Sequence, residues 1–144
     1  MYQVIRRESG IHVVPATCTR HPRRISRACA DAPDWIVRSE CDLRVGGRWT
    51  IEFGPPGGRP AQEACVFEVV ERPRRLVYRS TMTMPDGSSL VTRTHVTFEG
   101  TATGQTRVAV VQSGFPSAGL RDEFADGWSG IMVGLARVVA ARIA

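Results

Sequence analysis

The hydrophobic period changes once along this chain, and this change constrains the fold more than any other feature. Between Val37 and Ser113, apolar residues alternate with polar ones, as in the half-buried strands of an antiparallel sheet. From Leu120 onward, apolar residues recur every three or four positions, which is typical of one helix face. Several strands followed by one long helix predict an α+β fold.

The alternating region divides into six runs separated by turn-forming residues. The runs are 37–45, 48–53, 62–71, 76–84, 89–99 and 106–113. The residues expected on the inner face are Val37, Ser39, Cys41, Leu43, Val45, Trp49, Ile51, Phe53, Cys65, Phe67, Val69, Leu76, Tyr78, Ser80, Met82, Leu90, Thr92, Thr94, Val96, Phe98, Val108 and Val110. A seventh, shorter strand is expected over 11–14, and Ser117 is the expected N-cap of the helix.

The glycine pair in "DLRVGGRW" allows two interpretations, a phosphate-binding loop or a turn. A phosphate loop requires GxxxxGK[ST] or GxGxxG leading from a strand into a helix. Neither pattern is present, and an alternating run follows Gly46 and Gly47. The pair therefore predicts a hairpin turn, because glycine accepts a positive φ without steric cost.

Composition excludes several classes of function. A length of 144 residues predicts a single domain over 1–144. No apolar run approaches the roughly 20 residues that span a bilayer, and the first ten residues lack the apolar core of a signal peptide. We therefore expect a cytoplasmic protein with no membrane partner. The net charge is +5, with arginine but no lysine. Because these arginines are scattered, we expect no nucleic-acid partner.

The sequence offers no metal, cofactor or catalytic motif. The four cysteines lack CxxC spacing and the three histidines are dispersed, so we expect reduced thiols and no metal site. No GxSxG elbow is present. His95 falls on the polar side of its run, and Glu52 and Glu68 also face outward. No inward pair of carboxylates is found for acid–base work, so no catalytic residue is assigned.

Four blocks together resemble a known family. They are "DLRVGGRW", "VFEVVERPRRLVYRS", "HVTFEG…TRVAVVQSGF" and "GWSGIMVGLARVV". In this order and spacing they are similar to the activator-of-heat-shock-protein-ATPase-like branch of the START and polyketide-cyclase superfamily. The resemblance covers 37–139 and implies a helix grip, in which a curved antiparallel sheet wraps the C-terminal helix. Residues 1–35 diverge from the usual opening, where only Trp35 matches the aromatic residues of the family.

The resemblance implies that a cavity between sheet and helix takes a small apolar molecule. Inward aromatic residues with a few small polar groups are typical of such sites. The residues expected to bind the ligand are Trp35, Trp49, Phe53, Phe67, Tyr78, Met82, Thr94, Phe98, Phe124, Trp128 and Met132. The first hypothesis is non-catalytic binding of a small hydrophobic or aromatic ligand. The alternatives are a polyketide cyclase or aromatase, and a co-chaperone of a heat-shock ATPase. Whether the chain forms a homodimer stays open.

Overall fold

A single antiparallel sheet and one long helix make up the described structure. The computed structural model describes residues 5–7, 10–12, 36–100, 102 and 106–143. The strands are β1 (Ile5–Arg7), β2 (Gly10–His12), β3 (Ile36–Cys41), β4 (Arg48–Gly54), β5 (Ala61–Glu71), β6 (Arg75–Thr83), β7 (Ser89–Gly100) and β8 (Thr106–Ser113), and the helix is α1 (Ala118–Ile143). The strand order is β1-β2-β8-β7-β6-β5-β4-β3.

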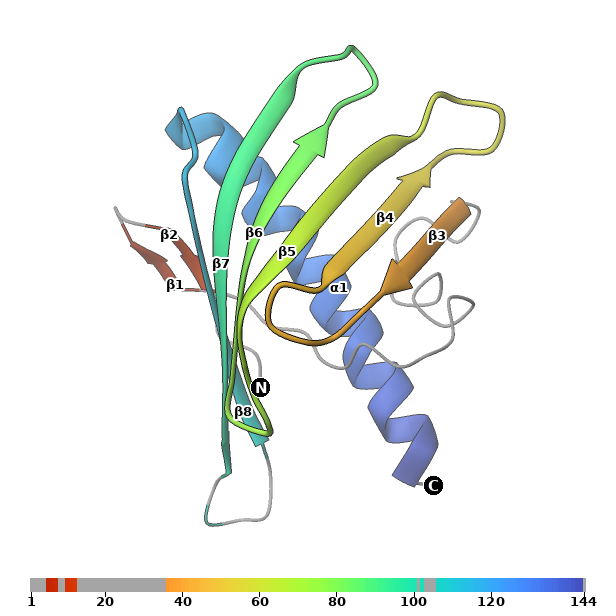
Figure 1. The fold of residues 1–144 in the computed structure, drawn as a ribbon. Coiled ribbons are helices and arrows are strands. Elements are labelled where there is room, and N and C mark those ends of the chain that lie inside the picture. Colours follow the sequence, from red (N-terminus) through yellow and green to blue (C-terminus); the bar gives the residue numbers. More distant parts are fainter. Residues whose placement is uncertain (1–4, 8–9, 13–35, 101, 103–105, 144) are drawn as a thin grey trace.

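The helix lies across one face of the sheet. It begins after β8 and runs diagonally behind the strands toward the side where β3 and β4 lie (Figure 1). The long strands bend along their length, so the sheet is curved around the helix (Figure 1). The predicted α+β helix grip is therefore confirmed. Part of the strand expected over 11–14 is present, as β2.

Strand pairing arranges the inward side chains in rows across the sheet. One row contains Trp49, Cys65, Ser80 and Thr92. The next contains Phe67, Tyr78, Thr94 and Gln112. A row on the other side contains Ile51, Glu63, Met82 and Leu90. The middle of the inner face is thus a mixture of aromatic and small polar groups, which matches most of the alternation in the sequence.

A β-bulge in β5 reverses one expected side-chain direction. Phe67 pairs with Tyr78, but the next pair in the register is Val69 with Val77. The extra residue between them shifts the alternation by one position. Val69 therefore lies with Val77 on the outer face, and Val70 packs against the core instead. The prediction that Val69 faces the core is wrong, because alternation alone does not reveal the inserted residue.

The chain leaves β3 earlier than the alternation predicts. This strand ends at Cys41, and Leu43 beyond it still packs against the core. Val45 is 62% exposed, so its expected place on the inner face is wrong. It lies within the turn, where strand geometry no longer determines side-chain direction.

The loop from Asp42 to Gly47 confirms the turn interpretation of the glycine pair. The Asp42 N–H donates to the Arg48 carbonyl at 2.8 Å, and Gly46 has a φ of 75°. The Gly46 N–H donates to the Phe67 carbonyl at 2.8 Å, and the Phe67 N–H donates to the Gly47 carbonyl at 3.0 Å. The turn is therefore tied to β5 as well as to β4, and it holds the chain directly beside Phe67.

The start of α1 follows the predicted capping. The Leu120 N–H donates to the Ser117 side-chain oxygen at 3.2 Å, so Ser117 is the N-cap. Further along, Ala125 and Met132 are buried, and Trp128 is partly buried against the same core. This spacing confirms one inward helix stripe over the part of α1 whose side chains are described, which ends at residue 132.

We expect Gly47→Ala to destabilise the protein by about 2–4 kcal/mol. A β-carbon at Gly47 would lie 2.1 Å from the backbone oxygen of Asp42, which cannot move without breaking the turn. Gly46→Ala meets nothing within 4 Å and should cost only the roughly 1–2 kcal/mol of a left-handed alanine. Urea unfolding of the purified variants measures both.

The control is Gly127→Ala, in the helix, where an added β-carbon meets nothing within 4 Å. This change should stabilise the protein by up to about 1 kcal/mol. Equal losses at Gly46 and Gly47 would contradict the close-approach explanation.

Candidate functional site

Three aromatic rings from adjacent strands meet on the inner face of the sheet. Trp49 on β4 stacks with Phe67 on β5, with ring centroids 6.4 Å apart and an interplanar angle of 4°. Tyr78 on β6 makes edge contacts with both, at centroid distances of 5.8 Å to Trp49 and 6.1 Å to Phe67. Contacts of this kind between aromatic rings stabilise the native state by more than the burial of their apolar surface alone. The Trp49 indole N–H also donates to the Ser39 hydroxyl at 2.8 Å, which fixes the ring.

The helix brings three further predicted residues to the same cluster. Met132 is buried, and Phe124 and Trp128 are partly buried against it. The Trp128 indole N–H donates to Oε1 of Gln112 at 2.7 Å. The Gln112 amide in turn donates to the Thr92 hydroxyl at 2.9 Å. This chain of hydrogen bonds fixes the position of α1 relative to β7 and β8.

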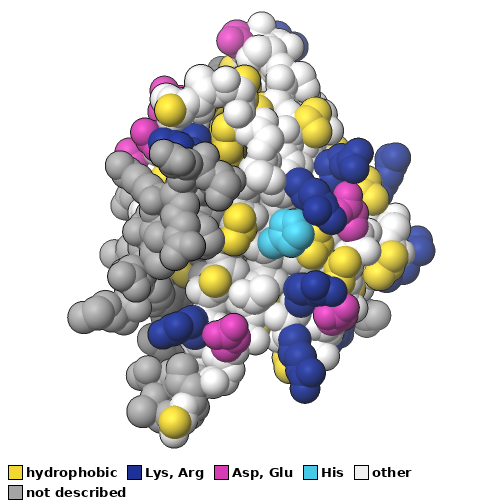
Figure 2. All heavy atoms as spheres, turned by 90° about the vertical axis from the view of Figure 1, so that its left-hand side faces the viewer, with side chains coloured by type: hydrophobic (Ala, Val, Ile, Leu, Met, Phe, Trp, Pro, Cys, Tyr) yellow, Lys and Arg dark blue, Asp and Glu magenta, His cyan; other side chains and the backbone are white. Residues whose placement is uncertain are grey.

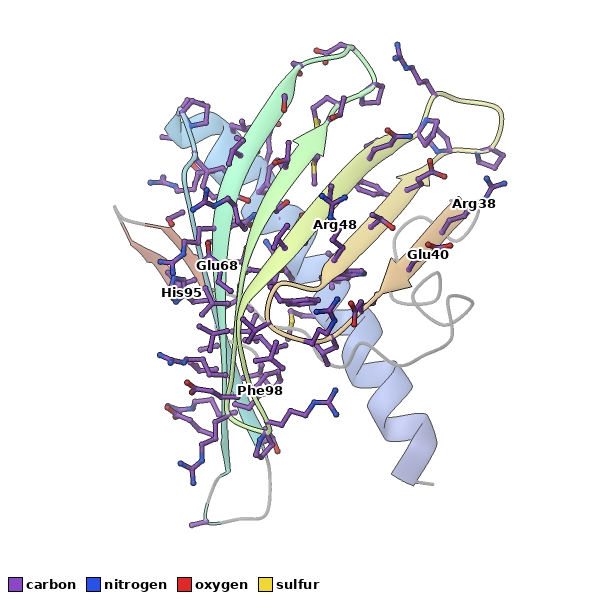
Figure 3. All side chains as sticks on the ribbon, in the orientation of Figure 1. Arg38, Glu40, Arg48, Glu68, His95 and Phe98 are labelled. Carbon is purple, nitrogen blue, oxygen red and sulfur yellow. The ribbon has the colours of Figure 1, made fainter. Side chains whose placement is uncertain are left out.

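The remaining predicted site residues spread along the inner face. Phe98 packs partly buried against the core cluster near one end of β7 (Figure 3). Met82 is 9% exposed and pairs with Leu90 at the other end of that strand. Phe53 is half-buried at the end of β4. Trp35 lies outside the described residues.

Thr94 carries an unsatisfied hydroxyl beside the aromatic cluster. The residue is fully buried, and its Oγ1 has no hydrogen-bond partner. Thr94 pairs with Tyr78 across β6 and β7, and the two side chains are close enough to interact. Burial is the main reason that the pKa of Tyr78 is raised, followed by the nearby Glu63, and the contact with Thr94 is the smallest effect and lowers it. Tyr78 therefore stays a neutral phenol.

Glu63 is an inward side chain that the candidate list omits. It lies on β5 between the buried residues Ala61 and Cys65, on the same face as both. The Ser80 hydroxyl donates to its carboxyl group. The signal was present in the sequence, since the alternation through Cys65 and Phe67 extends back to position 63. An acid at position 63 is nevertheless the residue type least expected on a face that α1 covers.

Burial determines the protonation states of Glu63 and of the neighbouring Cys65. Desolvation raises the pKa of Glu63, although hydrogen bonds with Ser80 and Cys65 partly oppose it. Desolvation also raises the pKa of Cys65, with a further contribution from the Glu63 charge. Burial penalises the charged form of each group. The inner face therefore holds its thiol and phenol neutral and favours the protonated form of Glu63.

The outer face carries charges that are paired. Glu68 receives a hydrogen bond from Nε of Arg93 at 2.6 Å and lies 3.4 Å from Arg79. The Arg93 bond is the main reason that the pKa of Glu68 is lowered. His95 lies on the same side of the sheet (Figure 3), among arginine and acidic side chains (Figure 2). Partial burial and then Arg93 lower the pKa of His95. Its predicted outward position is confirmed.

One cysteine differs from the expectation of reduced thiols. Cys41 is disulfide-bonded, so the prediction is wrong at this position. Cys65 is free and buried. The sequence pattern does not distinguish these two states, because neither cysteine belongs to a spacing motif.

The described residues contain no group of three or more histidine, cysteine or acidic side chains placed to hold a metal ion. Within the same part of the chain, no helix is both long and apolar enough to cross a bilayer.

We expect the two glutamates to give opposite pH dependences of stability. Above pH 4.5, the ordinary pKa, the unfolded chain releases the Glu63 proton while the native state holds it. Glu63 therefore lowers stability as pH rises through this value toward its folded pKa. Glu68 has a lowered pKa, so it stabilises above pH 4.5, and this contribution is lost as pH falls.

Urea unfolding from about pH 4 to about pH 8 checks this. The stability of Glu63→Gln relative to the wild type should rise with pH, and that of Glu68→Gln should fall. The same sign for both variants would contradict the assigned environments.

The comparisons with known proteins agree with this architecture. The crystal structure of protein CV1439 from Chromobacterium violaceum is 21% identical, with a TM-score of 0.67, over 91% of this chain and 97% of that one. Protein Ms6760 from Mycobacterium smegmatis is also 21% identical, with a TM-score of 0.63, over 83% of this chain and 77% of that one. A protein from Rhodobacter sphaeroides is 19% identical, with a TM-score of 0.62, over 96% and 98%.

No curated protein matches the sequence. These solved structures are similar to this chain at the level of fold. The family model described as "Activator of Hsp90 ATPase homolog 1-like protein" matches residues 30–140, which is most of the chain and includes the four blocks noted in the sequence. The chain therefore belongs to the family of activator of Hsp90 ATPase homolog 1-like proteins.

Proposed function

We propose that this protein binds a small, largely apolar or aromatic molecule between the sheet and α1. The observation that carries the proposal is the buried Thr94 hydroxyl, which has no hydrogen-bond partner beside the aromatic cluster of Trp49, Phe67 and Tyr78. Buried polar groups in native proteins are nearly always paired. A ligand that stacks on these rings and bonds to Thr94 would supply the missing partner.

Binding without turnover fits the chemistry of the inner face better than catalysis. Glu63 is the one carboxyl group facing inward among the described strand residues. Acid–base reactions at neutral pH commonly use two groups with separated pKa values. The other titratable groups near Glu63 are Cys65 and Tyr78, and burial holds both neutral. We therefore rank ligand binding above the cyclase or aromatase alternative.

N-phenylnaphthylamine, a neutral aromatic probe, should bind the protein and raise its melting temperature. A probe at one hundred times its Kd adds about 2.7 kcal/mol to the free energy of unfolding, since it binds only the native state. Ala125→Leu should reduce its affinity at least about tenfold. Ala125 is 1% exposed on the inward helix stripe, so leucine would occupy space that the probe needs. Probe fluorescence and thermal melting measure the two effects.

Val91→Leu is the matched control, because Val91 is 54% exposed on the outer face, and it should leave probe binding unchanged. If the region is already filled by side chains, wild-type protein will not bind the probe. Ala125→Leu will then cost about 1–3 kcal/mol through overpacking. That pair of results would overturn the proposal.

The family match favours a second candidate, stimulation of a heat-shock ATPase. The steady-state ATPase rate of a purified Hsp90-type chaperone, measured with and without this protein, tests it. A rate increase that saturates with protein concentration is the expected result if this candidate holds. An unchanged rate together with no co-sedimentation would remove it.

A further inference from the structure

Glu63 occupies an unusual place for an acid. Its neighbours across the strands are Ile51 on β4 and Met82 on β6, which are both apolar. Along β5 it lies between Ala61 and Cys65, which are both buried. Among the strand residues that the structure describes, it is the only acid on the inner face. Glu63 is therefore the one acid on a face whose other described side chains are apolar, aromatic or small polar groups.

The hydrogen bonds around Glu63 leave part of the carboxyl group available. An ionised carboxylate has about four acceptor positions. The Ser80 hydroxyl occupies one of them, and the Cys65 thiol also interacts with the group. Both partners are neutral, so neither offsets a negative charge.

Among the strand side chains that the structure describes, those of β3 to β8, no basic residue faces inward to pair with Glu63. On the helix, Arg121 is engaged with Asp122 at 3.1 Å. The contrast with the outer face is direct, because Glu68 has both Arg79 and Arg93 as partners. Glu63 is partly buried, and a poorly solvated charge without a partner is costly, so the usual solutions are an ion pair or protonation. A cation arriving with a ligand would provide the ion pair.

We propose that Glu63 binds a basic nitrogen, so that the ligand of this protein is an apolar or aromatic molecule carrying an amine. This inference rests on the proposed ligand-binding function and specifies its ligand class. Two of the nearby rings support it. The faces of Trp49 and Tyr78 attract cations, and both lie on the inner face with Glu63. The ammonium group would bind Glu63 while the apolar body stacks on the rings.

The test compares naphthylethylamine with naphthylethanol, which share the same aromatic body but differ in charge. Isothermal titration at neutral pH gives both Kd values. The amine should bind at least about tenfold more tightly than the alcohol, the factor equivalent to one pKa unit. Glu63→Gln should remove this preference by weakening amine binding, with alcohol binding kept within about twofold, because glutamine retains the shape without the charge.

Two further variants control the interpretation. Glu52→Gln removes a charge from the outer face of the neighbouring strand, where Glu52 accepts a hydrogen bond from Gln62 at 2.9 Å, and it should leave the amine preference unchanged. Glu63→Asp keeps the charge and should retain part of the preference. Thermal melting of each variant shows whether it folds, and the wild-type comparison of the two probes needs no variant.

The outcomes separate this inference from the proposed function. If the alcohol binds and the amine binds no more tightly than the alcohol, the inference is overturned and the ligand-binding proposal stands. If Glu63→Gln folds and retains the full preference, the role of Glu63 is overturned. If wild-type protein binds neither probe, both proposals fail.

Discussion

The arrangement of the inner face depends on one buried side chain, Gln112. Its amide accepts from the Trp128 indole at 2.7 Å and donates to the Thr92 hydroxyl at 2.9 Å. One residue thus joins β8, β7 and α1, and it is only 3% exposed. A single long helix could rotate or slide over a largely apolar sheet. Directional bonds in a low-dielectric interior restrict that freedom, and they hold Phe124 and Met132 toward the aromatic cluster.

The two faces of the sheet shift the pKa of a glutamate in opposite directions. Glu63 and Glu68 both lie on β5, but they are five residues apart, so the alternation along the strand places them on different sides. Outward, paired with Arg93 and Arg79, Glu68 has a lowered pKa. Inward, bonded only to neutral groups in the described region, Glu63 has a raised pKa. The chemical character of each glutamate is therefore set by its position in the strand and not by its neighbours in the sequence.

The spacing of apolar residues predicted the fold, because the buried face of each strand or helix requires apolar side chains at regular intervals. The change of period, the turn at Gly46 and Gly47, and the outward side of His95 all follow from it. Local irregularities were not predictable in this way. The bulge displaced Val69 because an inserted residue leaves no compositional mark. Of the site, the ring cluster was predicted by its apolar side chains. Glu63 was missed because an acid on the inner face contradicts the rule that identifies that face.

The exceptions to apolar burial are also the strongest indication of function. An apolar residue at position 63 would remove a desolvation penalty, and valine in place of Thr94 would remove a buried hydroxyl without a partner. Both changes would be expected to stabilise the native state. Neither polar side chain is needed to pair the strands, because backbone hydrogen bonds hold them together. Groups that cost stability without supporting the fold are typical of binding sites. Because both lie on the face that α1 covers, a single ligand with an apolar body and polar atoms could satisfy the two together.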